Sequence, residues 1–248
     1  MTPHDLKNSV WQLAVQGKLV DQRSDEGTGA ELFQQLQAEK QAQIKAGKIK
    51  KEKPLPEITE DEKPFDLPDG WCWARLATIC SLITDGTHKT PSYTTNGVRF
   101  LSVKDISGGY FDLSNTKFIS ENEHAQLTQA RFEEAEQEKY LLQQGDLLVC
   151  EGGDCGRAAI WESEQTMYYQ NALHRIRFYG NIDPHFYRFL LEYYKKAGII
   201  EQYSKGETIK HLVQNALYAM WMPLPPLAEQ KRIVAKLEEI LPLCDRLK

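Results

Sequence analysis

The last stretch of the chain, residues 222–248 (MPLPPLAEQKRIVAKLEEILPLCDRLK), places the strongest limits on the fold. Pro223, Pro225 and Pro226 fix φ and remove three backbone donors, which predicts an extended segment that cannot join the interior of a sheet or helix. Pro226 suits the first turn of a helix, because the N–H that it lacks would have no intrahelical partner there. The sequence therefore predicts a rigid, extended entry into a C-terminal helix.

This helix carries an apolar stripe with coiled-coil spacing. The stripe alternates in steps of four and three through Ile233, Leu237, Ile240, Cys244 and Leu247. Pro242 predicts a kink or a restart. The stripe continues to the last residues without a glycine cap, which favours a partner helix or a longer natural sequence. Packing on the chain's own domain is the open alternative, since three or more heptads are needed to predict a coiled coil.

The bulk composition indicates an ordinary soluble protein. The chain has 248 residues, of which 41% are hydrophobic and 26% charged, and its five cysteines form no C-x-x-C pair. These features predict a cytoplasmic location, reduced thiols and no metal site. The N-terminus is an amphipathic pattern rather than a signal peptide, and no segment has the length and apolarity of a membrane span. A net charge of −5 argues against a nucleic-acid binder unless basic residues gather locally.

Residues 1–66 are predicted as a helical region and a linker. Amphipathic helices are expected at 3–16, with Leu6, Val10 and Leu13, and at 30–46, with Leu32 and Leu36. Neither apolar face is wide enough for an isolated helix, so both helices should pack on something else. The linker, 47–66, is expected to be solvated and mobile because of its charge blocks. A phosphate-contacting role is the alternative for its four clustered lysines, which are Lys48, Lys50, Lys51 and Lys53.

Residues 67–222 are predicted as a mixed α/β (α+β) domain with short twisted strands. Turn chemistry at 68–70 is followed by alternating aromatics, which predicts a strand at 71–82. Further strands are expected at 98–103, 147–150, 158–161 and 173–178. Helices are expected at 184–198 and at 120–137, where Ser120 and Glu123 form a capping-box pattern. Residues 223–248 make the third part, the proline segment and the start of a coiled-coil-type helix.

No catalytic constellation is found. The glycine-rich loop at 152–156 lacks the Gly-Lys-Ser/Thr of a P-loop, and no helix follows it as in a dinucleotide fingerprint. No serine or cysteine has a nucleophile-elbow context, and the six histidines are dispersed. Pro68-Asp69 is better explained as a turn than as part of a nuclease site. The sequence therefore predicts a non-catalytic protein.

Three polar loops carry side chains that suit base edges and phosphates. Taken singly, each loop is more often solvated surface than a DNA contact, but residues 195–211 hold four lysines and one histidine against two glutamates. Arg157 is suited to a bidentate contact with guanine. The candidate DNA-binding residues are Thr87, His88, Lys89, Lys104, Arg157, Lys205, Thr208, Lys210 and His211.

The ordered set of motifs resembles the specificity (S) subunit of type I restriction–modification systems. The resemblance is carried by residues 13–20 (LAVQGKLV), 67–71 (LPDGW), 85–88 (DGTH), 100–106, 145–148, 206–212 and 223–230 (PLPPLAEQ), the last being the most specific. It covers nearly the whole chain. The family's usual chain has two recognition domains joined by long helices, whereas this one has a single domain and a half-length form.

The resemblance implies that the recognition domain reads one half of a bipartite DNA target through the major groove. The helices would act as a spacer and dock methyltransferase (M) subunits, which carry S-adenosylmethionine and flip out the adenine. The restriction (R) subunit would join through the complex. A half-length chain would pair with a second copy, giving a homodimer and a palindromic site. The helix residues expected at such interfaces are Leu6, Val10, Leu13, Leu32, Leu36, Ile233, Leu237, Ile240, Cys244 and Leu247.

Two alternatives from other classes remain. A stand-alone enzyme acting on nucleic acid is disfavoured, because methyltransferase and nuclease motifs are missing from the sequence. An S-like decoy or assembly factor would bind M subunits through its helices without specific DNA readout. The sequence leaves this second alternative open, because DNA specificity rests on scattered loops alone.

Overall fold

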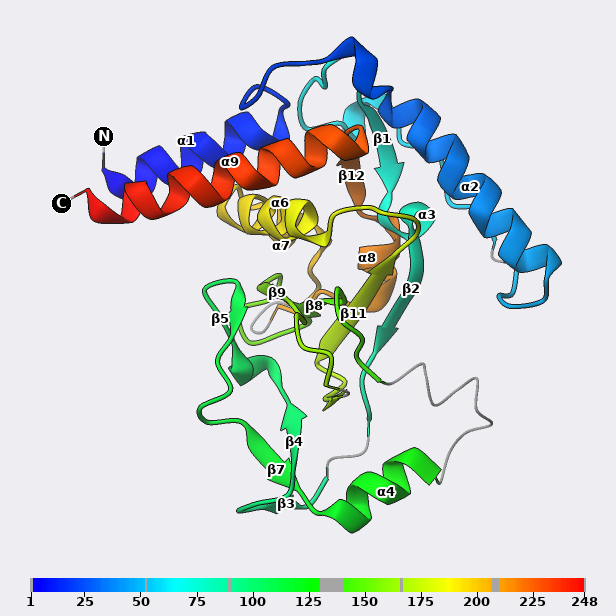
Figure 1. Ribbon diagram of the computed structural model, residues 1–248, viewed down its shortest axis with the longest axis vertical. Helices are drawn as coiled ribbons and strands as arrows, with labels where there is room; N and C mark the ends of the chain where they lie inside the picture. Colours follow the sequence, from blue (N-terminus) through cyan, green and yellow to red (C-terminus); the bar gives the residue numbers. More distant parts are fainter. Residues whose placement is uncertain are drawn as a thin grey trace. The chain divides into compact units, whose positions relative to one another are not determined.

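The computed structural model describes residues 2–51, 53–88, 91–129, 141–165, 167–206 and 210–247, and it confirms the mixed α/β fold (Figure 1). Its contacts form two compact units, each built from discontinuous segments. The helical unit comprises Met1–Ser81, Phe178–Ile199 and Asn215–Lys248, and the sheet unit comprises Leu82–Arg177 and Ile200–Gln214. No helix in the described part of the chain combines the length and apolarity needed to cross a membrane.

The helical unit contains most of the helices and one small sheet. Its helices are α1 (Pro3–Val15), α2 (Gly29–Lys45), α3 (Leu76–Ile79), α6 (Pro184–Lys196), α8 (Gln214–Ala219) and α9 (Leu227–Arg246), with 3-10 turns η1 (Ser24–Glu26) and η2 (Glu60–Glu62). Strands β1 (Cys72–Arg75) and β12 (Trp221–Leu224) pair antiparallel. Helix α7 (Ile199–Tyr203) begins at the end of one of its segments. Residues 67–81, 178–199 and 215–222 thus group with the helices, although the sequence-based boundaries put them in the recognition domain.

Local sequence signals fix the starts of both N-terminal helices. The Thr2 hydroxyl accepts from the Asp5 N–H at 3.1 Å, and the Asp5 carboxylate accepts from the Thr2 N–H at 2.8 Å. Thr28 and Glu31 form the same reciprocal capping box at the start of α2. Each box satisfies two backbone groups that a helix leaves without an intrahelical partner.

Helix α9 packs along α1 and α6 within its own unit, and α1 and α9 lie side by side (Figure 1). Ile233, Leu237 and Cys244 are buried in this packing. The helix follows Pro226, which takes the N-cap position, and it continues through Pro242 to Arg246 without a restart. Loss of the N–H of Pro242 is tolerated so near the helix end. The apolar stripe therefore packs largely against other helices of the same chain. This is the alternative to a coiled coil that the sequence left open.

Pro223 takes part in a sheet, but on an edge strand and not in the interior that the sequence excludes. This residue lies in β12 and pairs with Trp73 of β1. Both strands are edges of a two-stranded sheet, where a proline that donates no hydrogen bond is tolerated. The strand predicted at 71–82 is also interrupted, because the helical turn α3 separates β1 from β2 (Cys80–Asp85).

The Glu-Gln pair after the prolines ties distant segments of the helical unit together. The buried Glu229 carboxylate accepts from Trp71 Nε1 at 3.0 Å and from Gln22 Nε2 at 2.5 Å. The Gln230 amide oxygen accepts from the Asp183 N–H at 3.0 Å. Burial raises the pKa of Glu229, while these hydrogen bonds oppose the rise. The most specific motif of the sequence is thus a structural junction.

The linker is anchored rather than mobile over 56–62, which corrects the expectation from its charge blocks. The Arg75 guanidinium donates to the carbonyls of Pro56 at 3.2 Å and Glu57 at 3.1 Å, and to both carboxylate oxygens of Glu62 at 2.8 Å. The hydrogen bonds from Arg75 lower the pKa of Glu62 to about 2. One buried arginine therefore holds this part of the linker against the end of β1.

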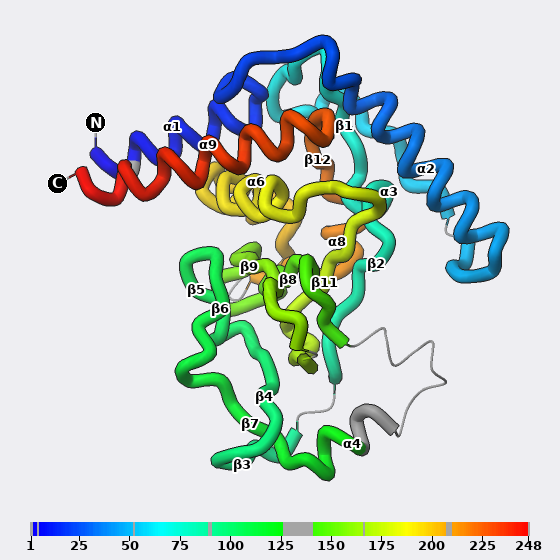
Figure 2. Tube along the Cα trace, viewed as in Figure 1, coloured from blue at the N-terminus to red at the C-terminus, as the bar shows by residue number. Residues whose placement is uncertain are grey.

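The sheet unit is built from two four-stranded sheets and a short β-ribbon. The first sheet has the order β2-β11-β8-β9, in which β11 (Leu173–Phe178) and β8 (Leu147–Cys150) pair antiparallel, as do β8 and β9 (Ala158–Ile160). The second has the order β10-β4-β7-β3, made of β10 (Tyr168–Tyr169), β4 (Val98–Leu101), β7 (Lys117–Ile119) and β3 (Tyr93–Thr94). The ribbon pairs β5 (Ile106–Ser107) with β6 (Tyr110–Phe111), after η3 (Val103–Asp105) (Figure 2).

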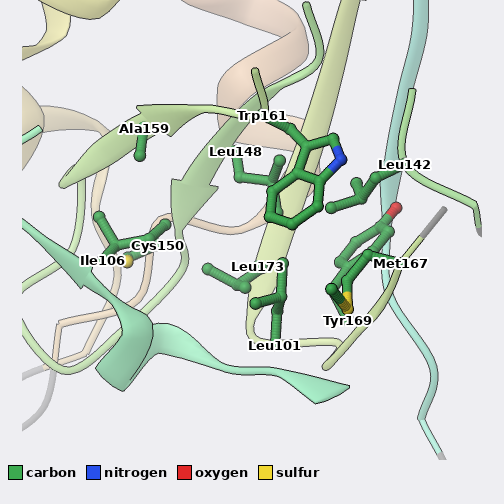
Figure 3. Close-up of a cluster of buried hydrophobic side chains, with 10 residues drawn as sticks. All are labelled: Leu101, Ile106, Leu142, Leu148, Cys150, Ala159, Trp161, Met167, Tyr169 and Leu173. Carbon is green, nitrogen blue, oxygen red and sulfur yellow. The ribbon is translucent and has the colours of Figure 1, made fainter. Parts of the chain in front are cut away.

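One apolar cluster joins the two sheets of this unit. Leu101 comes from β4, Tyr169 from β10, Leu148 from β8 and Leu173 from β11, and all are fully buried (Figure 3). The Trp161 ring lies in the same cluster and makes an edge contact with the Phe111 ring at 5.4 Å between centroids. Burial of such side chains stabilises the fold by roughly 1.5–3 kcal/mol each. The loops that leave these strands therefore start from a fixed framework.

Helix α4 (Glu121–Gln129) covers part of the helix predicted at 120–137, and the rest, 130–140, lies outside the described residues. The Ser120 hydroxyl accepts from the Glu123 N–H at 3.0 Å, as the capping pattern predicted. The Glu123 carboxylate accepts from the Ser92 N–H instead of closing the box. It thereby connects α4 to the segment before β3.

Two arginines of β11 form ion pairs within the sheet unit. Arg177 donates to both oxygens of Asp146, at 2.7 and 2.8 Å, and Arg175 Nη1 lies 3.6 Å from the same carboxylate. The side chains of Asp146 and Arg175 are almost fully buried. A buried charge is stable only when it is paired and hydrogen-bonded. Asp146 therefore pairs with the buried Arg175 and with Arg177, whose side chain is 27% exposed.

Candidate nucleic-acid interface

Loops that are far apart in the sequence meet at one end of the β2-β11-β8-β9 sheet. The Thr87 N–H donates to the Tyr169 carbonyl at 3.0 Å, and the Asn171 N–H donates to the Thr87 carbonyl at 3.2 Å. The Glu151 N–H donates to the Ala172 carbonyl at 2.9 Å, and the Glu151 carbonyl accepts from the Leu212 N–H at 2.7 Å. The segments after β2, before β11 and after β8, together with residues 204–206 and 210–211, thus form one surface, called here the loop end.

The glycine-rich loop at 151–157 has the shape that this convergence needs. A Cβ on Gly152 would meet the His211 ring at 3.3 Å. Gly156 has φ +82 and its added Cβ would meet Ile200 at 3.0 Å. Asp154 also adopts a positive φ of 85, which is uncommon outside glycine. Gly152 therefore allows His211 to pack against the loop, and Gly156 allows Ile200 to do so.

Arg157 is held by the protein itself. Its guanidinium donates to the carbonyls of Ile106 at 2.5 Å, Val103 at 3.1 Å and Gly153 at 3.2 Å, and Nε lies 3.5 Å from the Asp154 carboxylate. These bonds occupy most of the five N–H donors of the guanidinium. The expected bidentate contact of Arg157 with guanine finds no support in this geometry. Arg157 instead fastens the glycine-rich loop to the η3 turn.

Three lysines of the loop end are exposed. They are Lys104 on η3, which Arg157 anchors, and Lys205 and Lys210, which flank the backbone bridge between Lys205 and His211. Within the described residues, none of the three lysines forms an ion pair with a carboxylate. Their ammonium groups are therefore placed to contact an external anion.

The carboxylates of the loop end pair with the two histidines and with Arg157. His88 Nε2 lies 2.7 Å from the Asp85 carboxylate, and His211 Nδ1 lies 3.8 Å from the Glu151 carboxylate. The Asp154 carboxylate faces Arg157. The exposed lysines Lys104, Lys205 and Lys210 lie outside these three pairs.

Three predicted DNA-contacting residues remain. One of them is buried, and the other two lie outside the residues that the structure describes. Thr87 is only 7% exposed, and its backbone forms a β-bridge with Gln170. Its role is therefore to hold the backbone of the loop in place. Lys89 and Thr208 lie outside the described residues. The predicted contact residues that the structure brings together with exposed polar groups are therefore His88, Lys104, Lys205, Lys210 and His211.

A buried histidine lies beneath the loop end. His174 Nε2 is 2.8 Å from the Leu212 carbonyl, and its ring is 2% exposed. Burial lowers the pKa of His174, so the ring is neutral near pH 7 and donates its Nε2 proton to that carbonyl. This bond fixes the start of the segment that follows Lys210 and His211.

Two amides at the loop end were missed by sequence reasoning. Gln170 and Asn171 follow β10 and touch the Thr87 segment through the backbone, and both are partly exposed. Asn and Gln side chains form bidentate contacts with adenine. Their position directly before the strand at 173–178 was the available signal, because loops at strand ends carry recognition residues.

The helix residues predicted as interfaces are mostly buried inside the helical unit. Val10, Leu32, Leu36, Ile233, Leu237 and Cys244 are buried, and Leu6 and Ile240 are partly buried. Leu13 is 41% exposed and Leu247 is 53% exposed, and Leu243, which was not predicted, is 51% exposed. Only the two exposed members of the predicted set are therefore available to a partner.

A family model for the type I restriction modification DNA specificity domain matches residues 68–247. The chain belongs to this family. It is 30% identical over 249 residues to the type I restriction enzyme EcoAI specificity subunit of Escherichia coli, covering 98% of this chain and 40% of that protein. It is also 30% identical to the EcoEI specificity subunit of Escherichia coli, over 98% of this chain and 41% of that protein. The chain thus spans about two fifths of the length of these relatives.

Solved structures support the fold of this family member. The HsdS subunit from Thermoanaerobacter tengcongensis matches with a TM-score of 0.52 and 20% identity, over 98% of this chain and 49% of that chain. A chain from a structure of the type I R-M system, solved for its complex assembly and conformational transition, matches with a TM-score of 0.55, also at 20% identity, and half of that chain is covered. At this identity the likeness concerns the fold alone.

Proposed function

We propose that this chain reads one half of a bipartite DNA target for a type I restriction–modification complex and performs no chemistry itself. The observation that carries the proposal is the convergence of three predicted polar loops on one end of a rigid sheet. Family membership supports a role in DNA specificity. The chain would act in the cytoplasm, where such a complex meets DNA.

The loop end offers two kinds of contact that DNA recognition needs. Lys104, Lys205 and Lys210 would contact phosphates, which supplies affinity without sequence information. Asn171 and His211 would reach base edges in the major groove, where each base pair presents its own donor and acceptor pattern. The four-stranded sheet would hold these side chains in one orientation.

The helical unit would dock the methyltransferase subunits. Leu13 of α1 and Leu243 and Leu247 near the end of α9 are large apolar side chains left exposed on the two adjacent helices. The M subunits would carry S-adenosylmethionine and flip the adenine, and the R subunit would join through the assembled complex. The specificity subunit would determine which DNA site the complex binds and the spacing between the two halves of that site.

Self-association into a homodimer is part of the proposal. Two copies would supply two recognition units, which suits a chain that spans about two fifths of its full-length relatives. A two-fold arrangement predicts a palindromic bipartite target. Sedimentation equilibrium at tens of micromolar tests this directly, and a monomer throughout that range contradicts it.

The decisive experiment is adenine-methylation sequencing of plasmid DNA from cells that carry this chain and its cognate M subunit. A symmetric bipartite motif is the expected result. If the M subunit co-purifies with the chain but no motif appears, the proposal is wrong and the decoy or assembly-factor interpretation is favoured. Cells with the M subunit alone give the background.

Paired variants test the assignment of the loop end. Lys205→Gln with Lys210→Gln should reduce methylation of the motif at least tenfold. Lys45→Gln with Lys48→Gln removes the same charge from exposed positions of the helical unit and should leave methylation unchanged. Equal effects of the two pairs would contradict the assignment.

A further inference from the structure

The helical unit contains a cavity that the recognition of DNA bases does not use. Its volume is about 760 Å³, and its walls come from α2, the linker at 51–55, α3 and α8. Ile44 and Leu55 give part of the lining an apolar character, while Asn215 and Tyr218 add polar groups. A cavity of this size can hold a phosphorylated group of nucleotide size.

The charged side chains around this cavity are all basic. Lys40 of α2 and Lys51 and Lys53 of the linker line it, and no acidic residue is found among the described lining residues. Glu52, between the two linker lysines, lies outside the description. Three ammonium groups around a partly apolar cavity create a local positive potential in a chain whose net charge is −5.

The acidic residues of the same linker line a different cavity. That cavity, of about 700 Å³, is bordered by Glu57, Glu60, Asp66 and Asp69, and it shares Leu55 with the basic one. Lys63 and Arg75 also line that second cavity, so its charges are mixed. The basic cavity differs from it because lysines are the charged residues among its described lining residues.

Hydrogen bonds fix the backbone beside this cavity. Arg75 donates to the carbonyls of Pro56 and Glu57, a few residues after Lys53. On the facing side, Gln37 Nε2 of α2 donates to the Thr78 carbonyl at 2.7 Å, and Lys40 Nζ donates to the Ala77 carbonyl at 3.5 Å, which ties α2 to α3. A cavity with fixed walls binds an anion with a smaller loss of conformational entropy than a mobile segment does.

We propose that this cavity, called here the lysine cavity, binds a phosphate of the DNA backbone as a second, sequence-independent contact outside the loop end. The proposal rests on the proposed function for the presence of DNA, but it uses other residues and another unit of the chain. The lysine cavity would add affinity for any duplex and no discrimination between sequences, because a phosphate carries no base information.

The test measures DNA affinity as a function of salt concentration for the complex with the M subunit. Neutralising one phosphate contributes a slope of about −0.9 to the plot of log K against log salt. Lys51→Gln with Lys53→Gln should make the slope shallower by about 0.9 and weaken specific and non-specific DNA binding by the same factor. Lys45→Gln with Lys231→Gln removes equal charge from exposed positions of α2 and α9, outside the lysine cavity, and should leave the slope unchanged.

The possible results separate the two proposals. If both lysine pairs have the same slope as the wild type, or as each other, the lysine cavity does not bind DNA. If the wild-type complex binds DNA without sequence preference, the proposed function fails while the slope comparison still decides the cavity. If the complex binds no DNA, both proposals are wrong. Equal thermal unfolding of the variants confirms that each remains folded.

Discussion

Replacing Arg157 with alanine distinguishes a structural arginine from one that reads DNA. The side chain donates to the Ile106 carbonyl at 2.5 Å and to the Val103 carbonyl at 3.1 Å, which joins the loop at 151–157 to the η3 turn. Hydrogen bonds from a charged donor contribute about 1.5–3 kcal/mol each. Two such bonds, which are not fully additive, correspond to about 3 kcal/mol, or roughly a hundredfold in the equilibrium between the closed and open loop.

Hydrogen exchange followed residue by residue measures this opening. The Gly156 N–H donates to the Cys150 carbonyl at 2.9 Å, and the Asp112 N–H donates to the Asp105 carbonyl at 2.8 Å, so the two amides report on opposite sides of the Arg157 contact. In Arg157→Ala both should exchange up to a hundredfold faster. DNA affinity should fall as well, because the glycine-rich loop and Lys104 lose their support.

Lys210→Ala is the matched comparison. Lys210 is exposed, so its loss should weaken DNA binding and leave the exchange of both amides unchanged. If Arg157→Ala also leaves exchange unchanged, while DNA affinity falls and discrimination at one base pair is lost, Arg157 contacts a base and the structural assignment is refuted.

Three further substitutions probe the framework around the loop end and the linker. Asp146→Asn leaves the buried guanidinium of Arg175 and the partly exposed one of Arg177 without their carboxylate and should cost about 3–5 kcal/mol in denaturant unfolding, whereas a loss below about 1 kcal/mol would contradict the pairing. The pKa of His174 is lowered below 6.5 by burial, so stability should be constant above pH 6.5 and fall as the pH drops below it. His174→Gln should flatten this dependence between pH 7.5 and 5.5, and an unchanged slope would exclude His174 as its source. Arg75→Ala should free the linker, which limited proteolysis at 54–66 will detect as faster cleavage than in the wild type. The wild-type anchor should be present above pH 4.5 and weaken as the pH falls towards 2, because the pKa of Glu62 is lowered from 4.5 to about 2; pH-independent protection would argue against the ion pair.

The fold class and the three recognition loops were accessible from the sequence because they depend on local patterns. Alternating apolar residues predicted the strands at 98–103, 147–150 and 173–178, and each is present in whole or in part. Polar loops between these strands were visible as candidate contacts. That the loops meet at one end of a sheet was not visible, because strand order is set by long-range pairing.

The role of a single charged residue was harder to predict than the position of its loop. Arg157 and Lys210 look alike in the sequence, as basic residues in polar loops. The structure separates them, since the first donates to carbonyls of η3 and its surroundings and the second is exposed. The difference depends on the fold of residues 103–106, which lie about fifty positions away from Arg157, and no local pattern carries it.

The linker shows a second limit of prediction from local sequence. Its composition predicts a mobile segment, but Arg75, buried at the end of β1, binds two of its carbonyls and one carboxylate. Composition describes what a segment does in the absence of a partner. A single well-placed guanidinium is enough to hold part of it in place.

The motif that identifies the family and the residues proposed to read DNA lie in different units. Glu229 and Gln230 connect Trp71, Gln22 and Asp183 inside the helical unit, and this requires fixed side chains. The loop end requires a fixed backbone framework, while its exposed lysines form no ion pair with a carboxylate of the described residues that would restrict their type. The resemblance can therefore be strong over the scaffold and carry no information on the target bases. Exchanging the exposed loop residues for those of another family member should change the methylated motif and preserve the stability of the helical unit.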